Sequence, residues 1–117
     1  MKKINILKES KDFDNIIHTG KYIKNKHYII YYKEASEKYY RFGLSVGKKI
    51  SNKAVIRNKL KRRLKSIIDN NKNDYQKSKD YIIIMKRNCI DATYEELEVS
   101  FLNIMNQLEK GAQNEKK

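Results

Sequence analysis

The side chains with the strongest chemical signal in this sequence are the cations of residues 48–65. This stretch holds nine Lys and Arg residues in eighteen positions and contains no acidic residue. Cations at this density favour binding to a polyanion. The first expectation is therefore a binding surface for phosphate groups or another anionic partner.

The same stretch has the spacing of an amphipathic helix that begins near Asn52 and ends near Asp69. Ser51 and Asn52 are good N-cap residues, and no Gly or Pro follows before Gly111. Apolar residues recur at three- and four-residue spacing, which places them on one face. These residues are Ile56, Leu60, Leu64, Ile67 and Ile68. We expect this face to be buried and the opposite face to be basic.

The cations on the basic face repel each other, and an anionic ligand would remove this repulsion. Seven Lys or Arg residues lie between Lys53 and Lys65 with no carboxylate among them. Like charges three or four residues apart repel each other by roughly 0.2–0.5 kcal/mol per pair. A phosphate backbone would relieve this repulsion, so a nucleic acid is favoured over a solvated basic helix without a ligand, which is the alternative.

The whole chain is basic, with 27 Lys and Arg against 14 Asp and Glu, a net charge of +13 in 117 residues. This excess indicates a nucleic acid or an anionic surface as partner. No apolar run approaches the ~20 residues of a membrane span, and the polar start argues against a signal peptide. We expect a cytoplasmic protein without a membrane partner, with one domain at residues 1–110 and a disordered tail at 111–117.

Residue types suited to catalysis and metal binding are scarce. Cys89 is the only cysteine, and His18 and His27 are the only histidines, so neither a disulfide framework nor a zinc site is expected. Ser45 precedes a Gly-Lys-Lys sequence, which lacks the spacing of a phosphate loop. We expect no catalytic residue, no metal ligand and no cofactor bound by the protein itself.

Two further helices are predicted, one at each end of the chain. Ser10 is typical of an N-cap, and Gly20 fits the C′ position of a short first helix. Thr93 and Glu96 have the spacing of a capping box, which predicts a last helix that ends before Gly111.

Strand patterns fill the space between the helices. A β-like stretch at 22–33 has a polar break at 24–26, and a second strand covers 39–46 after a polar segment that suggests a hairpin. Residues 80–85 form the most apolar run and predict a central strand buried on both faces. The expected order is α-β-β-β-α-β-α.

Two aromatic residues could bind nucleic acid by stacking. Phe13 lies on the apolar stripe of the first helix and Tyr31 on the first long strand. Aromatic side chains stack on unpaired bases of any sequence. Plain core packing is the alternative for both rings.

Four segments resemble the bacterial ribonuclease P protein family in the same order and spacing. The basic helix has the spacing A-x-x-R-N-x-x-K-R of the family's signature helix, formed by Ala54, Arg57, Asn58, Lys61 and Arg62. Residues 11–20 resemble its first helix, with Asp-Phe followed by Gly. Residues 41–49, Arg-Phe-Gly-Leu-Ser-Val-Gly-Lys-Lys, and 80–84, Asp-Tyr-Ile-Ile-Ile, resemble two of its strands.

The resemblance implies an α+β fold, an α/β sandwich with a central sheet. In it the basic helix links two parallel strands by a left-handed crossover, against the general right-handed preference. It implies a protein subunit of the endoribonuclease that removes the 5′ leader from precursor tRNA. The RNA subunit of that enzyme performs the hydrolysis and requires Mg²⁺. The implied partners are this catalytic RNA and precursor tRNA, with no DNA.

The resemblance also assigns residues to two surfaces. The implied RNA-binding set is Lys48, Lys49, Lys53, Arg57, Asn58, Lys61, Arg62 and Lys65. The implied leader-binding cleft is lined by Phe13, Ile17 and Tyr31. Two positions depart from the family pattern. Lys65 replaces an Arg and loses its planar fork, and Ile17 stands where an aromatic residue is frequent and cannot stack a base.

Two other classes of protein share part of this pattern. A small ribosomal or other structural RNA-binding protein, without a role in cleavage, has the same size and charge. A DNA-binding module is disfavoured because a groove-reading helix follows a partner helix across a tight turn. Here a strand precedes the basic helix.

Overall fold

The elements form in the order that the sequence predicts, with one added turn of 3₁₀-helix. A computed structural model describes residues 6–7, 10–35, 39–47, 49–71 and 79–114. The helices are α1 (Ser10–Thr19), α2 (Ala54–Asn70) and α3 (Tyr94–Asn114), and the 3₁₀ turn is η3 (Arg87–Cys89). The strands are β1 (Lys21–Lys24), β2 (Tyr28–Glu34), β3 (Arg41–Ser45) and β4 (Lys79–Met85).

The strands form one sheet in the order β1-β2-β4-β3. β4 lies between β2, which is antiparallel to it, and β3, which is parallel to it. It is buried along nearly its whole length, as expected for the central strand. The expected hairpin between the second and third strands is wrong, because β4 occupies the place between β2 and β3.

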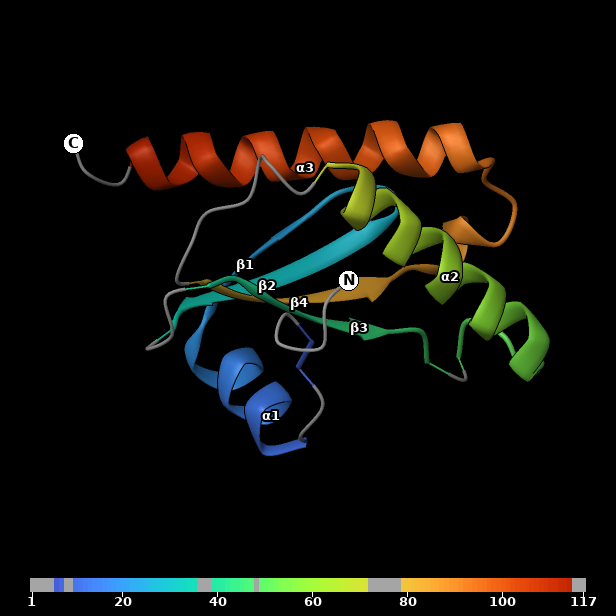
Figure 1. The fold of residues 1–117 in the computed structure, drawn as a ribbon, viewed down its shortest axis with the longest axis horizontal. Helices are drawn as coiled ribbons and strands as arrows, with labels where there is room; N and C mark the ends of the chain where they lie inside the picture. Colours follow the sequence, from blue (N-terminus) through green and yellow to red (C-terminus); the bar gives the residue numbers. More distant parts are fainter. Residues whose placement is uncertain (1–5, 8–9, 36–38, 48, 72–78, 115–117) are drawn as a thin grey trace.

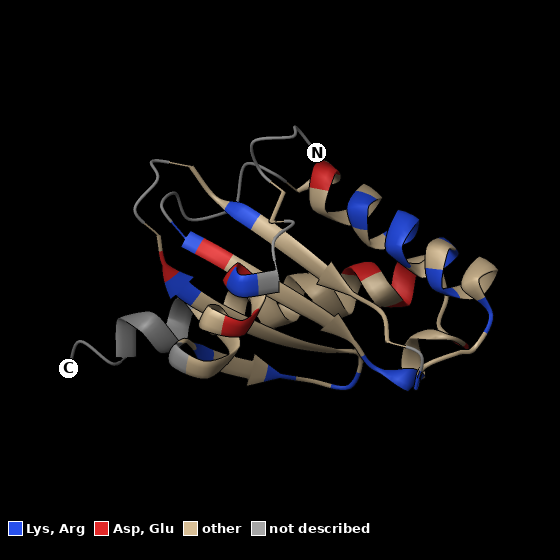
Figure 2. Cartoon of the chain, turned by 90° about the horizontal axis from the view of Figure 1, so that it is seen from below, with Lys and Arg blue, Asp and Glu red and all other residues tan. Residues whose placement is uncertain are grey.

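The sheet is covered on both faces, which confirms the predicted α/β sandwich. α2 and α3 lie on one face and α1 on the other (Figure 1). α2 connects β3 to its parallel neighbour β4. Seen from the α2 side with these strands pointing upward, β4 lies to the left of β3, so the crossover is left-handed as expected (Figures 1 and 2).

The main core fills the space between the sheet and the pair α2 and α3. Tyr28, Phe42 and Tyr81 are completely buried there, and the rings of Phe42 and Tyr81 stack with centroids 4.9 Å apart. The hydroxyl of Tyr28 donates to the carbonyl of Leu97 in α3 at 2.9 Å. Of the alternating tyrosines on β2, Tyr28 therefore belongs to the core side of the sheet.

The ends of α1 and α3 show how local sequence sets the boundaries. A Cβ on Gly20 would lie 2.5 Å from the carbonyl oxygen of Ile16 and 2.6 Å from that of Tyr32, so only glycine allows α1 to end this close to β2. Thr93 and Glu96 form the predicted capping box through two 3.1 Å hydrogen bonds. α3 continues to Asn114, past its predicted end.

Candidate nucleic-acid interface

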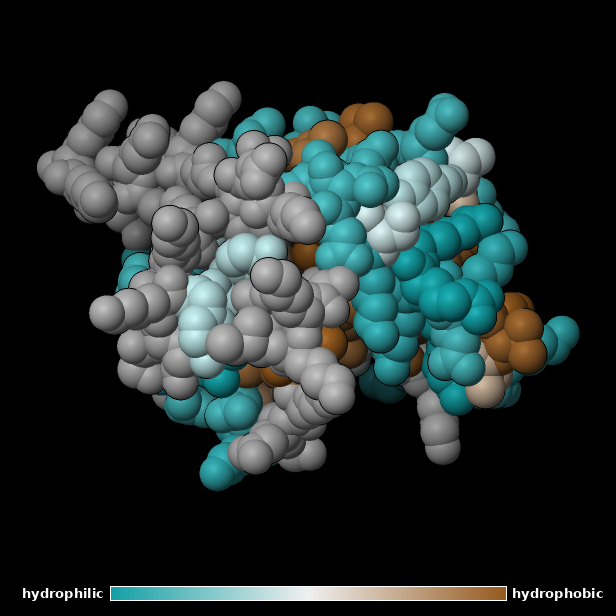
Figure 3. All heavy atoms as spheres, in the orientation of Figure 1, coloured by the Kyte–Doolittle hydropathy of each residue, from teal (hydrophilic) through white to brown (hydrophobic). Residues whose placement is uncertain are grey.

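α2 presents its cations on the side away from the core. Leu60, Leu64, Ile67 and Ile68 are buried against the sheet and α3, which confirms the predicted apolar face. Blue bands of Lys and Arg recur along α2 in Figure 2, and the surface over α2 in Figure 3 is mostly hydrophilic. At about 100° per residue, Asn58, Lys61, Arg62 and Lys65 fall on the side of the helix away from the core, whereas Lys59 and Arg63 fall on the flank toward α3.

The members of the predicted RNA-binding set differ in exposure. Lys49, Lys53, Asn58, Arg62 and Lys65 are exposed, whereas Arg57 and Lys61 are half-buried at the border of the apolar face. Lys49 lies in the turn that connects β3 to α2, and Lys48 lies outside the described residues. The structure thus gathers seven of the eight predicted residues along α2 and the turn that precedes it.

Arg57 makes a structural hydrogen bond that sequence reasoning did not anticipate. Its Nη1 donates to the carbonyl of Ser51 at 2.8 Å, so the guanidinium folds back on the loop before the helix. Ser51 does not cap the helix by itself, because the helix begins at Ala54 and its N-cap Lys53 makes no side-chain capping bond. A guanidinium has five N–H donors, so Arg57 can hold this loop and also meet a phosphate.

The opposite flank of α2 faces α3 and serves the fold. Arg63 donates from Nη1 to the carbonyl of Ala92 at 3.3 Å. The hydroxyl of Tyr94 lies 2.9 Å from Ser66 Oγ and accepts from Asn70 Nδ2 at 3.2 Å. Arg63 therefore helps to hold α2 against the segment that precedes α3.

The second candidate surface lies on the other face of the sheet, beside α1. Leu7, Ile16 and Ile82 form a small buried cluster there. Phe13, Ile17, Tyr31 and Ile84 pack around this cluster and remain partly exposed. The three residues predicted to line a leader-binding cleft are thus brought together by α1, β2 and β4.

Phe13 closes one end of this surface by lying on a glycine of the sheet. A Cβ on Gly43 would be 2.5 Å from Cζ of Phe13 and 2.9 Å from Cε1. The missing side chain at Gly43 therefore makes room for the aromatic ring. Phe13 is half-buried, so it packs against the sheet and still keeps part of its surface exposed. Base stacking by this ring stays a prediction.

The pairing register extends this surface across the sheet. Gly43 pairs with Ile82, Ile82 with Tyr31, and Tyr31 with Tyr22, so these four positions form one row on the α1 side. The neighbouring row on the same side consists of Ser45, Ile84, Ile29 and Lys24. Ile29 and Ile84 are half-buried, so this row is apolar between Ser45 at one end and Lys24 at the other.

A bidentate ion pair lies on the α1 side of the sheet, next to the row of Gly43 and Ile82. Arg41 donates from Nε to Asp80 Oδ1 at 2.8 Å and from Nη2 to Oδ2 at 2.7 Å. Asp12 and Lys33 line a hollow of about 310 Å³ together with this pair. Bidentate pairing fixes the orientation of both side chains.

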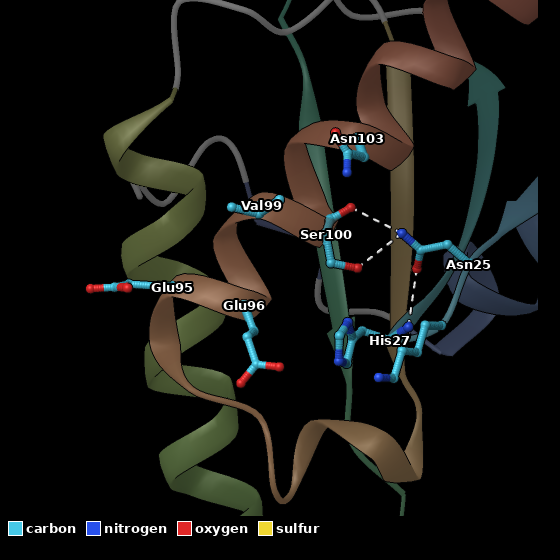
Figure 4. A pocket seen from close by; sticks show the side chains of 8 residues that line it. Asn25, His27, Glu95, Glu96, Val99, Ser100 and Asn103 are labelled. Atoms are coloured by element: carbon cyan, nitrogen blue, oxygen red, sulfur yellow. Dashed lines mark hydrogen bonds between the residues drawn. The ribbon is translucent and has the colours of Figure 1, made fainter.

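A separate hollow of about 480 Å³ lies where the β1–β2 turn meets α3 (Figure 4). Asn25 holds its wall in place: its amide donates to Ser100 O and Oγ, both at 3.0 Å, and its Oδ1 accepts from the backbone N–H of His27 at 3.1 Å. Glu96 lines the same hollow (Figure 4).

The imidazole of His27 is buried at this hollow. Its Nδ1 has no hydrogen-bond partner among the described atoms. Burial lowers the pKa of His27 below its ordinary value of 6.5, and Lys26 adds to this effect while Glu96 opposes it. The carbonyl of His27 accepts from the buried thiol of Cys89 at 3.1 Å, and burial raises the pKa of that thiol to about 11. Cys89 is thus a buried thiol that stays protonated at neutral pH.

The described residues contain no group of three His, Cys, Asp or Glu side chains able to hold a metal ion. No described helix has the length and apolar character needed to cross a membrane.

The fold and its two surfaces place the molecule among small, basic α+β proteins with a left-handed β3–α2–β4 crossover. The chain belongs to the ribonuclease P protein family: the family model described as Ribonuclease P matches residues 1–109. This confirms the resemblance inferred from the four sequence segments.

Individual relatives agree with this assignment. The ribonuclease P protein component of Mycoplasma mycoides is 38% identical over 109 residues, which cover 92% of this chain and 99% of that protein. The protein component of Bacillus cereus is 36% identical over 105 residues, covering 89% and 90% of the two chains.

Solved structures show the same fold. A Staphylococcus aureus ribonuclease P protein, a mutant with defective mRNA degradation activity, superposes with a TM-score of 0.85 at 27% identity, covering 92% of this chain and 90% of that chain. The Thermotoga maritima ribonuclease P protein gives 0.80 at 27% identity, covering 86% and 94%.

Proposed function

We propose that this chain binds the catalytic RNA of ribonuclease P through α2 and the 5′ leader of precursor tRNA through the cleft beside α1. The chain is a protein subunit of the ribonuclease P type. The observation that carries the proposal is the placement of the two surfaces, which β3 connects. Gly43 on β3 lies under Phe13 in the cleft, and the same strand continues through the Lys49 turn into α2.

In this proposal the RNA subunit cleaves the leader with bound Mg²⁺, and the protein supplies binding. The chain contributes no catalytic residue and holds no cofactor itself. Its cations neutralise RNA phosphates along α2. The partly exposed ring of Tyr31 and the apolar floor formed by Ile29 and Ile84 accept unpaired leader bases, which are thereby removed from water. The proposed partners are therefore the catalytic RNA and precursor tRNA.

Reconstitution with a bacterial ribonuclease P RNA tests this function. Precursor-tRNA cleavage at low Mg²⁺ should rise when the chain is added, because bound cations reduce the repulsion between enzyme RNA and substrate RNA. If the chain binds the RNA without changing cleavage, it acts as a structural RNA-binding protein instead.

The same assay without the RNA subunit tests where the chemistry lies. RNA-free protein should leave precursor tRNA intact with any divalent metal ion. One Staphylococcus aureus relative is a mutant with defective mRNA degradation activity. The control should therefore include an mRNA substrate beside precursor tRNA. Cleavage of precursor tRNA by the protein alone would contradict the proposal.

A further inference from the structure

Tyr22 is a large aromatic side chain left exposed at the edge of the sheet. It is 60% exposed, and it is one of three large hydrophobic residues exposed among the described residues, with Val55 and Val99. It lies on β1, the edge strand, and pairs with Tyr31 of β2 on the α1 side of the sheet. The two rings are 5.5 Å apart between centroids and inclined by 41°.

We propose that Tyr22 extends the leader-binding cleft by stacking one more unpaired base beyond Tyr31. The inference rests on the proposed function and adds a residue to its binding surface. Phe13, Tyr31 and Tyr22 follow one another along the row that starts at Gly43, so aromatic rings occur from β3 to the opposite edge of the sheet. A single strand that crosses the strands along this row would meet the three rings in turn.

The surroundings of Tyr22 suit an RNA strand. Lys24 on β1 is exposed and lies in the neighbouring row of the same face, whereas Lys21 pairs with Tyr32 and belongs to the opposite face. A cation beside an exposed ring is the combination that binds single strands without sequence preference. Ile17 on α1 is aliphatic and cannot stack on a base. Base stacking near Tyr31 would therefore come from the rings on β2 and β1.

The position of Tyr22 also predicts which leader nucleotides it meets. α2, which binds the catalytic RNA in the proposed function, packs over the β3 side of the sheet, whereas β1 is the far edge (Figures 1 and 2). The proposal places the cleavage site toward α2, and so toward the Phe13 end of the surface, with Tyr22 at the remote end. Nucleotides near the 5′ end of a long leader reach Tyr22, and a short leader ends before it.

A purely structural role is the competing explanation for Tyr22. Cross-strand aromatic pairs stabilise antiparallel ladders on their own. In that case Tyr22→Ala would lower the stability of the protein and weaken all substrates equally. Tyr22→Phe keeps the ring and its packing, so it serves as the matched variant.

The test measures the affinity of the reconstituted holoenzyme for precursor tRNA with a short and with a long leader. Tyr22→Ala should weaken long-leader binding by about 5- to 10-fold, the lower part of the range for one stacked base. Short-leader binding should not change, the melting temperature should fall by no more than the loss of one exposed cross-strand pair explains, and Tyr22→Phe should behave as wild type. Equal weakening for both leaders, or no weakening for either, would overturn the inference.

Tyr31→Ala in the same assay separates this inference from the proposed function. If Tyr31→Ala weakens leader binding and Tyr22→Ala does not, the cleft stands and Tyr22 is outside it. If neither variant responds to the leader, the assignment of the cleft itself fails.

Discussion

The ring of Phe13 lies on the backbone of Gly43, where a Cβ would be only 2.5 Å from Cζ of the ring. This packing seats the first half of α1 on β3 and places one aromatic edge in the proposed leader-binding cleft. A glycine in a strand weakens the strand by itself, so its presence in β3 is explained by this close approach. Phe13 and Gly43 therefore contribute both to the packing of α1 on the sheet and to the proposed leader-binding surface.

Gly43→Ala should destabilise the protein, because the new methyl group must displace the Phe13 ring and with it α1. Such overpacking costs about 1–3 kcal/mol of unfolding free energy. Urea unfolding measures the change. Gly47→Ala is the matched control on the same segment, since its Cβ would meet no atom nearer than 4.0 Å, at the backbone N of Lys49; it should be nearly neutral.

A double-mutant cycle assigns the cost of Gly43→Ala to the close approach of Phe13. In a Phe13→Ala background, the ring is gone and Gly43→Ala should cost much less than in the wild type. An unchanged cost in that background would show that the strain at position 43 comes from the backbone.

Phe13→Ala and Tyr31→Ala should both weaken binding of precursor tRNA more than binding of mature tRNA. Removing one stacking side chain costs ~1–3 kcal/mol per base. Phe13→Ala should also lower the unfolding free energy, by less than the ~3–5 kcal/mol of a fully buried Phe, because the half-buried ring packs between α1 and β3. Holoenzyme affinities for both tRNA forms, read beside the melting temperatures of the free variants, separate the two effects. Equal decreases for both tRNA forms would remove both residues from the leader site.

Arg62→Ala with Lys65→Ala should weaken assembly with the catalytic RNA and leave folding unchanged, since both side chains are exposed on α2. Removing one cation that neutralises a phosphate should flatten the log–log salt dependence of binding by roughly 0.7–0.9. This pair is a cleaner test than Arg57→Ala with Lys61→Ala, because Arg57 also holds the carbonyl of Ser51.

Lys59→Ala is the control for the α2 variants, since it removes an exposed cation from the flank of the helix nearer to α3. We expect a smaller change in the salt slope for Lys59→Ala than for either residue of the pair. Equal slopes for all three positions would mean that the helix binds RNA through net charge and not through one face.

The buried His27 predicts a loss of stability at mildly acidic pH. Its pKa in the folded protein lies below 6.5, so the unfolded chain takes up a proton first as the pH falls. The unfolding free energy should therefore decrease as the pH drops below about 6.5 and level off below the folded-state pKa. His27→Gln should remove this decrease in urea-unfolding midpoints measured across the range.

Glu96 titrates in a different pH range from His27. It therefore does not affect the comparison of stability between the wild type and His27→Gln. Its hydrogen bonds to Thr93 lower its pKa below the ordinary 4.5, so its contribution is lost only at more acidic pH. If His27→Gln and the wild type lose stability in parallel between about pH 6.5 and pH 5, the imidazole is not the group that titrates.

Much of the fold follows from local patterns in the sequence. The spacing of Leu60, Leu64 and Ile67 predicts both the helix and its buried face, and the capping box from Thr93 to Glu96 predicts the start of α3 within a residue. These features depend on neighbours three or four positions apart, which a single sequence displays directly.

The parts that sequence reasoning missed depend on pairing between distant segments. The insertion of β4 between β2 and β3 depends on pairing across the whole crossover, and the Arg41–Asp80 pair joins residues 39 positions apart. Tyr22 belongs to a row with Tyr31 only through the register of the β1–β2 hairpin, which the side chain of Asn25 sets in the turn. None of these leaves a periodic signal.

In the proposed function, this protein makes the ribonuclease P holoenzyme prefer substrates that carry a leader. The most direct measurement compares dissociation constants of precursor and mature tRNA for the RNA subunit alone and for the RNA subunit with the wild-type chain. We expect the chain to increase affinity for precursor tRNA well beyond any increase for mature tRNA. An equal increase for both substrates, or none, would contradict the claim.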